Sequence, residues 1–187
     1  MIATSVHIHL KTEPFDLQSC LVGSWLVLLH ARRIPPHVGL VINGHYNSLT
    51  VKGHELDVPV EAIYKAVQLK KIESLFIKVI DHPVFSRDYQ LAVLQEMIQS
   101  YPSVKHDVAT CLSPLKEFFQ EFYALPLQAN ELLFDFITRL NANHYLEKAL
   151  PINIHLAEEG IELPFYTIKL LHEKIKNERL PFYNDSH

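Results

Sequence analysis

HVGLVINGHYNSLTVKGHE, residues 37–55, contains two β-strand patterns joined by a turn signal. HVGLVI directly precedes the turn dipeptide Asn43–Gly44, and SLTVKG follows a few residues later. This pattern indicates a β-hairpin inside a sheet. The stretch also holds three histidines, and His37 opens the first strand. The sequence therefore raises the question whether His37 is an ordinary strand residue or one member of a catalytic pair.

The composition of the chain indicates one compact domain. With 187 residues, of which 48% are hydrophobic, the chain can build a sizeable core. The formal net charge is -4, and the basic and acidic residues are interspersed, so no basic stripe indicates a nucleic-acid partner. No apolar segment reaches the roughly 18 residues of a membrane span, and the N-terminus lacks a signal-peptide pattern. We expect a cytoplasmic protein that binds no nucleic acid.

Strand and helix patterns on both sides of the hairpin predict a mixed fold. Strand patterns occur at residues 5–11, 23–29 and 74–80, and helical patterns begin at Pro59 and Ser86 and recur at 115–123, 132–140 and 164–178. These patterns predict an α+β fold with an antiparallel sheet packed against helices. We expect residues 1–124 to form its core and residues 125–187 to form a helical C-terminal extension packed on the same domain.

Cys111 lies in the segment TCLSPLKEFF, where Thr110, Ser113 and Pro114 announce the start of a helix. A thiol at a helix start faces the unpaired amides of the first turn, which with a nearby imidazolium can lower its pKa from about 8.5 to between about 3.5 and 7.5. A thiol hydrolase also needs a histidine that takes the thiol proton, and a third polar residue that orients this histidine. We expect His37 to be that histidine and the helix-start amides to hold the oxyanion.

The identity of the third polar residue depends on the register of the hairpin. One register places His54 opposite His37, and another places Lys52 there. His54 is the first choice, because a neutral imidazole can hydrogen-bond to the ring of His37 whereas a lysine would repel an imidazolium. Glu55 is a further alternative, which requires a shift of register.

The order of these segments carries a family resemblance. GSWLVLL, then PPHVGLVING, SLTVKG and later TCLSPLKEFF resemble the circularly permuted papain-like hydrolases, related to NlpC-type cell-wall peptidases and to lecithin retinol acyltransferase. The resemblance covers roughly residues 20–123 and implies a papain-like core in which Cys111 is the nucleophile and His37 the base. Three features depart from the family pattern: Ser24 stands where an aspartate is expected, no Cys-Ser-Glu occurs, and Lys52 stands near the place of an acidic residue.

Two functions are compatible with this pattern. The first is a cysteine-dependent hydrolase or acyltransferase without a cofactor, which cleaves an amide or ester in a peptide or an acyl-containing small substrate. A peptidase or amidase of cell-wall-type peptides is one form that it could take. The alternative is a catalytically inactive papain-like binding or scaffold protein. In that case apolar residues such as Phe134, Phe136, Phe165 and Tyr166 form a partner surface or a homodimer contact.

Cys20 is a rival nucleophile. If LQSCLVGSWLVLLHARR formed a helix capped by Asp16, Cys20 would lie in its second turn and His37 would follow, as in unpermuted papain-like enzymes. His37 follows Cys20 by only 17 positions, which leaves little room for the strand that those enzymes insert. We therefore rank Cys20 below Cys111 and expect a buried core thiol.

Other polar residues give weaker indications of a site. His7 and His9 share one face of a strand, which suits two metal ligands, but no third ligand accompanies them, so we predict no metal. His106 and Asp107 precede the predicted nucleophile and would tune its thiol if their loop folds over it. The chain has no glycine-rich phosphate cradle, which disfavours nucleotide chemistry.

Overall fold

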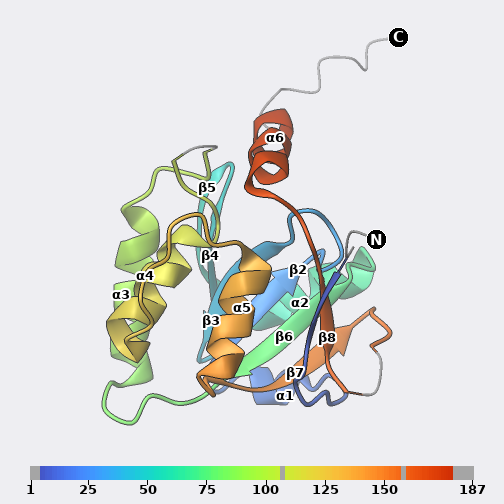
Figure 1. Cartoon of the computed structure of the whole chain (residues 1–187). Coiled ribbons are helices and arrows are strands. Elements are labelled where there is room, and N and C mark those ends of the chain that lie inside the picture. Colours follow the sequence, from blue (N-terminus) through green and yellow to red (C-terminus); the bar gives the residue numbers. More distant parts are fainter. Residues whose placement is uncertain (1–4, 106–107, 157–158, 179–187) are drawn as a thin grey trace.

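The computed structural model describes residues 5–105, 108–156 and 159–178. Within these residues the chain forms a six-stranded antiparallel sheet, a two-stranded antiparallel sheet and six helices (Figure 1). The expected α+β class, with an antiparallel sheet packed against helices, is confirmed. In the part of the chain that is described, no helix is long and apolar enough to cross a membrane.

The central sheet has the strand order β5-β4-β3-β2-β6-β7. Its strands are β2 (Ser24–Leu29), β3 (His37–Ile42), β4 (His45–Thr50), β5 (Gly53–Pro59), β6 (Ser74–Val79) and β7 (Leu146–Ile152). Because helices cover both faces, its middle strands are apolar along nearly their whole length, and SWLVLL of β2 is buried except at its last residue.

The hairpin between β3 and β4 turns at Asn43 and Gly44, as its sequence signal predicts. Both residues have positive φ values, 48° and 81°, which a two-residue hairpin turn of this kind requires. Ile42 pairs with His45 directly across the turn, so the hairpin is centred between Asn43 and Gly44. Both expected registers are therefore wrong, because each places the centre one or two residues too far along the chain.

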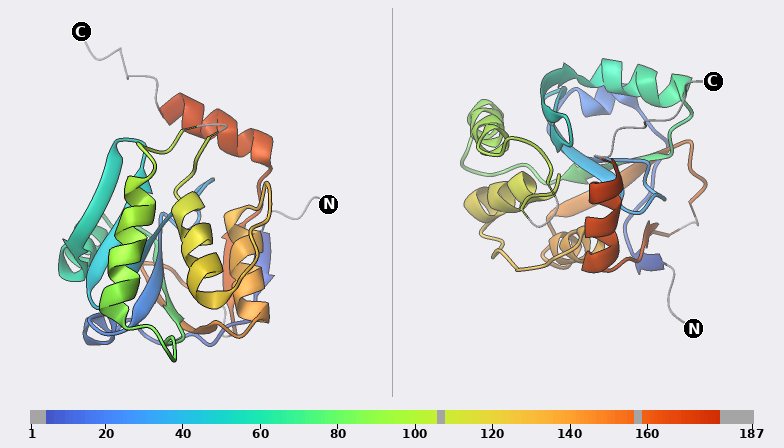
Figure 2. Two further views of the ribbon diagram at one scale, coloured as in Figure 1. Left: turned by 90° about the vertical axis from the view of Figure 1, so that its left-hand side faces the viewer. Right: turned by 90° about the horizontal axis from the view of Figure 1, so that it is seen from above.

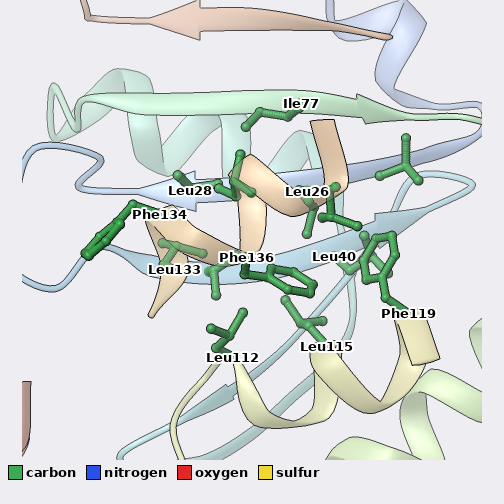
Figure 3. Close-up of a cluster of buried hydrophobic side chains, with 14 of the residues drawn as sticks. Leu26, Leu28, Leu40, Ile77, Leu112, Leu115, Phe119, Leu133, Phe134 and Phe136 are labelled. Carbon is green, nitrogen blue, oxygen red and sulfur yellow. The ribbon is translucent and has the colours of Figure 1, made fainter. Parts of the chain in front are cut away.

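Helices sandwich the sheet in two layers. On one face, α3 (Arg87–Gln99), α4 (Ser113–Tyr123) and α5 (Leu133–Ala142) pack against alternate strand residues such as Leu26, Leu28 and Leu40 (Figure 3). On the other face, α1 (Leu17–Cys20) and α2 (Val60–Leu69) cover a second cluster that includes Trp25 and Tyr46. The view from above in Figure 2 shows the sheet between these two layers.

Residues 125–187 are not a helical extension, and this expectation is corrected. β7 joins the central sheet beside β6, and β8 (Ile161–Pro164) pairs with β1 (Ser5–Ile8) from the opposite end of the chain. Only α5 and α6 (Ile168–Glu178) are helical in the described part of this region. The sequence does not reveal these strands, because β7 and β8 pair with β6 and β1, which lie far away in the chain.

The aromatic residues of this region contribute mainly to the core. Phe134, Phe136 and Tyr166 are all less than 7% exposed, whereas Phe165 is 39% exposed. On α5, the Phe136 ring packs against Phe119 of α4, and the Phe134 ring packs against Phe165 and Tyr166 (Figure 3). The first three side chains are therefore not available as the partner surface that the sequence suggested.

Candidate thiol site

A cavity of about 320 Å³ lies where the start of β3, the segment before α4 and the helix α6 meet. Its lining includes His37, Glu55 and Cys111. The chain thus brings the expected nucleophile and the expected base, which are far apart in the sequence, into one cavity. Its volume falls at the lower end of the range of about 300–1,000 Å³ that is typical of small-molecule sites.

The cavity wall is mostly apolar. The apolar lining residues are Leu29, Pro35, Pro36, Val38, Val51, Val104, Leu112, Leu132, Leu133, Tyr166, Leu171 and Ile175. Leu171 and Ile175 come from α6, which lies above the ends of α4 and α5 in Figure 1 and in the left view of Figure 2. The C-terminal helix therefore forms part of the wall of the site.

A hydrogen-bond chain fixes the ring of His37. Its Nε2 atom lies 3.2 Å from the Ser48 hydroxyl, which donates to Glu55 Oε2 at 2.9 Å. Because the hydroxyl proton points to the carboxylate, the hydroxyl oxygen accepts the proton of Nε2–H. This arrangement leaves Nδ1 of His37 as the unprotonated nitrogen that can accept a proton.

The surroundings of His37 favour its neutral form. Burial lowers the pKa of the His37 imidazole below its ordinary value of 6.5, and the Glu55 carboxylate opposes this shift more weakly. Ser48 and Glu55 pair directly across β4 and β5, which places the carboxylate behind the hydroxyl. An imidazole that is neutral near pH 7 is suited to act as a general base.

Glu55, and not His54, is the residue coupled to His37, which corrects the first choice from the sequence. His54 pairs with Leu49, one residue along β4 from Ser48, so its side chain lies on the opposite face of the sheet. Its ring is exposed and bonds to the backbone carbonyl of Tyr101. Lys52, the other alternative, is exposed in the turn between β4 and β5.

Ser48 is the residue that sequence reasoning missed. In the register of the hairpin, even-numbered residues of β4 share a face with odd-numbered residues of β3, since Val41 pairs with Tyr46. A hairpin centred on Asn43–Gly44 therefore places Ser48 on the same face as His37. The turn signal contained this information, and the wrong choice of centre concealed it.

Gly39 of the HVG motif has a packing role beside His37. A Cβ atom at this position would lie 2.4 to 2.7 Å from the Cε2, Cζ and hydroxyl atoms of Tyr46. Tyr46 is completely buried, so its ring has little room to move. Glycine is thus required here because the Tyr46 ring crosses the strand two residues after His37.

Cys111 is half-buried and lies two residues before the first residue of α4. The turn around it is locked by side chains, because Leu112 N donates to Thr110 Oγ1 at 3.2 Å and Thr110 N donates to Ser113 Oγ at 2.9 Å. The positive end of the α4 dipole lies close to this turn.

Two of the amides at the start of α4, those of Leu112 and Ser113, are already engaged in hydrogen bonds. Leu112 N–H donates to the Thr110 hydroxyl, Ser113 N–H donates to the Thr110 carbonyl at 3.1 Å, and Pro114 has no N–H. The expectation of a ready oxyanion hole is therefore corrected for the amides of Leu112 and Ser113. The sequence TCLSP explains the difference, since threonine and serine side chains compete for nearby backbone amides.

A buried ion pair forms another part of the cavity wall. The side chain of Glu131 is only 1% exposed, and Arg139 binds its two carboxylate oxygens at 2.6 and 2.9 Å. Lys116 lies 3.7 Å from the same carboxylate and connects it to α4. This network, which the sequence did not indicate, pairs the Glu131 charge and joins α4 to α5 beside the site.

Cys20 does not lie at the cavity. It is fully buried between α1 and the sheet, and burial raises the pKa of its thiol to about 12. The long helix that would have made Cys20 a nucleophile does not form, because α1 ends at Cys20 and β2 begins at Ser24. Cys20 is a core residue, as expected.

The weaker indications do not develop into a metal site. The rings of His7 and His9 meet edge to face at 4.7 Å. Among the described residues, no group of three or more histidine, cysteine, aspartate or glutamate side chains is arranged to hold a metal ion. His106 and Asp107 lie outside the described residues.

The site thus combines a thiol, a neutral imidazole of defined orientation and an apolar cavity. These groups are the parts that nucleophilic acyl transfer requires, apart from a ready oxyanion hole. Comparisons with protein-family models, with curated proteins and with solved structures found no match for this chain.

Proposed function

We propose that the protein is a cysteine-dependent hydrolase or acyltransferase that cleaves an amide or ester bond, with a papain-like arrangement of its site. The observation that carries this proposal is the cavity that Cys111 shares with His37, whose ring is held through Ser48 by Glu55. The order of the base on a strand and the nucleophile before a later helix is the order of the permuted papain-like family. Of the nucleophile, the base and the residue that orients the base, the first two are therefore side chains that the sequence already singled out.

In the proposed reaction His37 moves one proton in each half. Its Nδ1 takes the proton of the Cys111 thiol as the sulfur attacks the substrate carbonyl, and the resulting imidazolium returns that proton to the leaving amine or alcohol. Water or an acceptor alcohol or amine then attacks the acyl-enzyme, His37 takes its proton, and the thiol regains a proton as the product leaves. The Ser48–Glu55 pair orients the ring and stabilises its charged form during these steps.

Oxyanion stabilisation requires a local change at Cys111. Leu112 N–H becomes available to a substrate oxygen only when it leaves the Thr110 hydroxyl. An oxyanion donor contributes about 3 kcal/mol in well-studied hydrolases, which exceeds the roughly 1 kcal/mol of an ordinary hydrogen bond. We propose that the substrate draws this amide away from Thr110.

The apolar wall selects the substrate class. A peptide with an apolar side chain or an acyl chain would bury its surface against Val38, Leu133 and the α6 residues that line the cavity. We therefore place peptides and acyl-containing small molecules first as substrates.

The pH dependence of Cys111 alkylation tests the thiol–imidazole pair. Iodoacetamide labelling, with mass spectrometry to identify the modified cysteine, is measured on the natural chain, His37→Ala and the control His54→Ala. We expect Cys111 of the natural chain to react well below pH 8, His37→Ala to lose this reactivity, and the control to keep it. Ordinary thiol behaviour in all three proteins would contradict the proposal.

A non-catalytic binding protein is the second candidate. It is favoured by the engagement of the Leu112 and Ser113 amides at the site where an oxyanion hole is needed. Such a protein would bind apolar ligands in the same cavity without transferring an acyl group. Formation of a covalent acyl adduct on Cys111 from an activated ester, detected by intact mass and absent in Cys111→Ser, decides between the two.

A further inference from the structure

A second cavity, of about 420 Å³, adjoins the thiol cavity at His30, which lines both. Its walls come from the loop after β2 and from the turn between α2 and β6. Ala31 N donates to the Glu73 carbonyl at 2.9 Å and joins these two segments. The lining residues are His30, Arg32, Arg33, Lys70, Lys71, Ile72 and Glu73.

The second cavity concentrates positive charge on an otherwise acidic chain. Four of its lining side chains are cationic and one is a carboxylate, whereas the whole chain has a formal net charge of -4. The carboxylate, Glu73, is bound by Arg32 at 3.2 Å, and Arg32 also donates to the His155 carbonyl. Within the described residues no carboxylate forms an ion pair with Arg33, Lys70 or Lys71.

Only part of this charge has a role in the fold. Lys70 caps the C-terminus of α2 and Lys71 follows it, and cations at this end of a helix are stabilised by its dipole. Arg33 has no such role, since it lies in the loop after β2. Burial, and then the charges of Arg33 and Lys70, lower the pKa of His30, which places these cations within electrostatic reach of the wall that the two cavities share.

We propose that the second cavity binds a phosphate or carboxylate group of the substrate while the acyl part of the same molecule occupies the thiol cavity. Arg33, Lys70 and Lys71 repel one another, and an anion bound between them relieves this repulsion and gains charge-assisted hydrogen bonds. The substrate class is then an acyl compound that carries an anionic group. This assignment of the acyl part rests on the proposed function, whereas the anion site stands on its own charges.

Binding of short amphiphiles tests the joint site. Octyl phosphate, octanoate, 1-octanol and inorganic phosphate are titrated against the full chain, with the imidazole signals of His30 followed by NMR. We expect octyl phosphate or octanoate to bind at least about tenfold more tightly than inorganic phosphate and 1-octanol, because one molecule then occupies two adjoining sites. Tighter binding of the alkyl phosphate identifies a phosphate ligand, and tighter binding of octanoate identifies a carboxylate ligand.

A matched pair of variants separates the cavity from the overall charge. Arg33→Gln with Lys70→Gln removes two lining cations, and we expect it to weaken binding of the preferred anion about fivefold. Lys65→Gln with Lys169→Gln removes two exposed cations that line neither cavity, and it should change the affinity less than twofold. Equal losses in both pairs, or no saturable binding of either octyl anion, would overturn the anion site.

Protection of Cys111 tests the connection between the cavities. The preferred octyl anion should slow iodoacetamide labelling of Cys111, and inorganic phosphate should not. Binding without protection would overturn the assignment of one molecule to both cavities. Failure of the proposed catalysis can be told apart from failure of the joint site. If Cys111 labels like an ordinary thiol in both the natural chain and His37→Ala, the catalytic proposal is contradicted. The binding titration is repeated on Cys111→Ser and needs no turnover, so it still tests the anion site.

Discussion

The two cysteines of the chain lie in contrasting regions. Cys20 ends α1 and is enclosed by the second core cluster, among Trp25, Val41 and Tyr46. Cys111 precedes α4 and lines a cavity together with His37. Both thiols lie at the end of a helix, Cys20 at the last residue of α1 and Cys111 just before α4, so a position at a helix end does not by itself distinguish them. The difference teaches that the position of a thiol relative to the layers of the fold decides which chemistry it can carry.

The largest expected effect is the difference in reactivity between the two thiols. Burial raises the pKa of Cys20 to about 12 from 9.0, which leaves about a thousandfold less thiolate near pH 7. We therefore expect Cys111 to react with iodoacetamide at least about a thousandfold faster than Cys20 in the folded protein. Time courses of peptide mass spectrometry at pH 7 measure the ratio.

Unfolding provides the control for this ratio. In concentrated urea both thiols are exposed, and their rates should differ by less than about tenfold. A native protein in which Cys20 reacts as fast as Cys111 would remove the contrast between the two regions.

Tight packing around Tyr46 predicts the next effect. Gly39→Ala should destabilise the fold by about 1–3 kcal/mol, because the new methyl group would lie less than 3 Å from the buried Tyr46 ring. Urea unfolding measures the loss. In a Tyr46→Leu background the same change should cost less, since the ring that it meets is gone. Equal costs in both backgrounds would show that the glycine serves another purpose.

The fold shows which parts of the sequence carry their own structural information. The Asn43–Gly44 turn and the helix start at Ser86, whose hydroxyl accepts from Tyr89 N, follow from local rules and were predicted. β7 and β8 were not, because their pairing with β6 and β1 is decided by contacts between distant segments. A strand whose sequence shows no clear alternation is recognised only through the partner that it pairs with.

The site was predictable to a similar extent. Residue type and element order singled out Cys111 and His37, which line one cavity. The coupling of His37 to Glu55 through Ser48 depends on a register that a one-residue error changes completely. The bond between Leu112 N–H and the Thr110 hydroxyl depends on a side-chain rotamer, which sequence patterns do not specify.

The pH dependence of stability sharpens the description of the Cys111 region. Burial lowers the pKa of His37 in the folded protein, so the unfolded chain binds the proton more readily. The resulting stability is present above the ordinary pKa of 6.5 and is lost as the pH falls through the lower folded value. We expect His37→Gln to lose less stability than the natural chain between pH 7.5 and a more acidic pH, as measured by urea unfolding. An unchanged difference would mean that His37 is more exposed than its cavity suggests.

The smallest expected effects come from two neighbours on β5, Glu55 and His54. Glu55→Gln keeps the shape of the side chain but removes the charge that stabilises the imidazolium, so the rate of Cys111 acylation by an activated ester should fall about threefold to tenfold.

His54→Gln is the matched control, because this side chain lies on the opposite face and bonds to the Tyr101 carbonyl. It should leave the acylation rate within about twofold. A larger loss for His54→Gln than for Glu55→Gln would reverse the assignment, because it would mean that the face of β5 directed away from Ser48 contributes to the reaction. Because the two residues are neighbours on one strand, they differ mainly in the face of the sheet on which their side chains lie. Such a result would therefore mean that the register of β5 differs from the one described here.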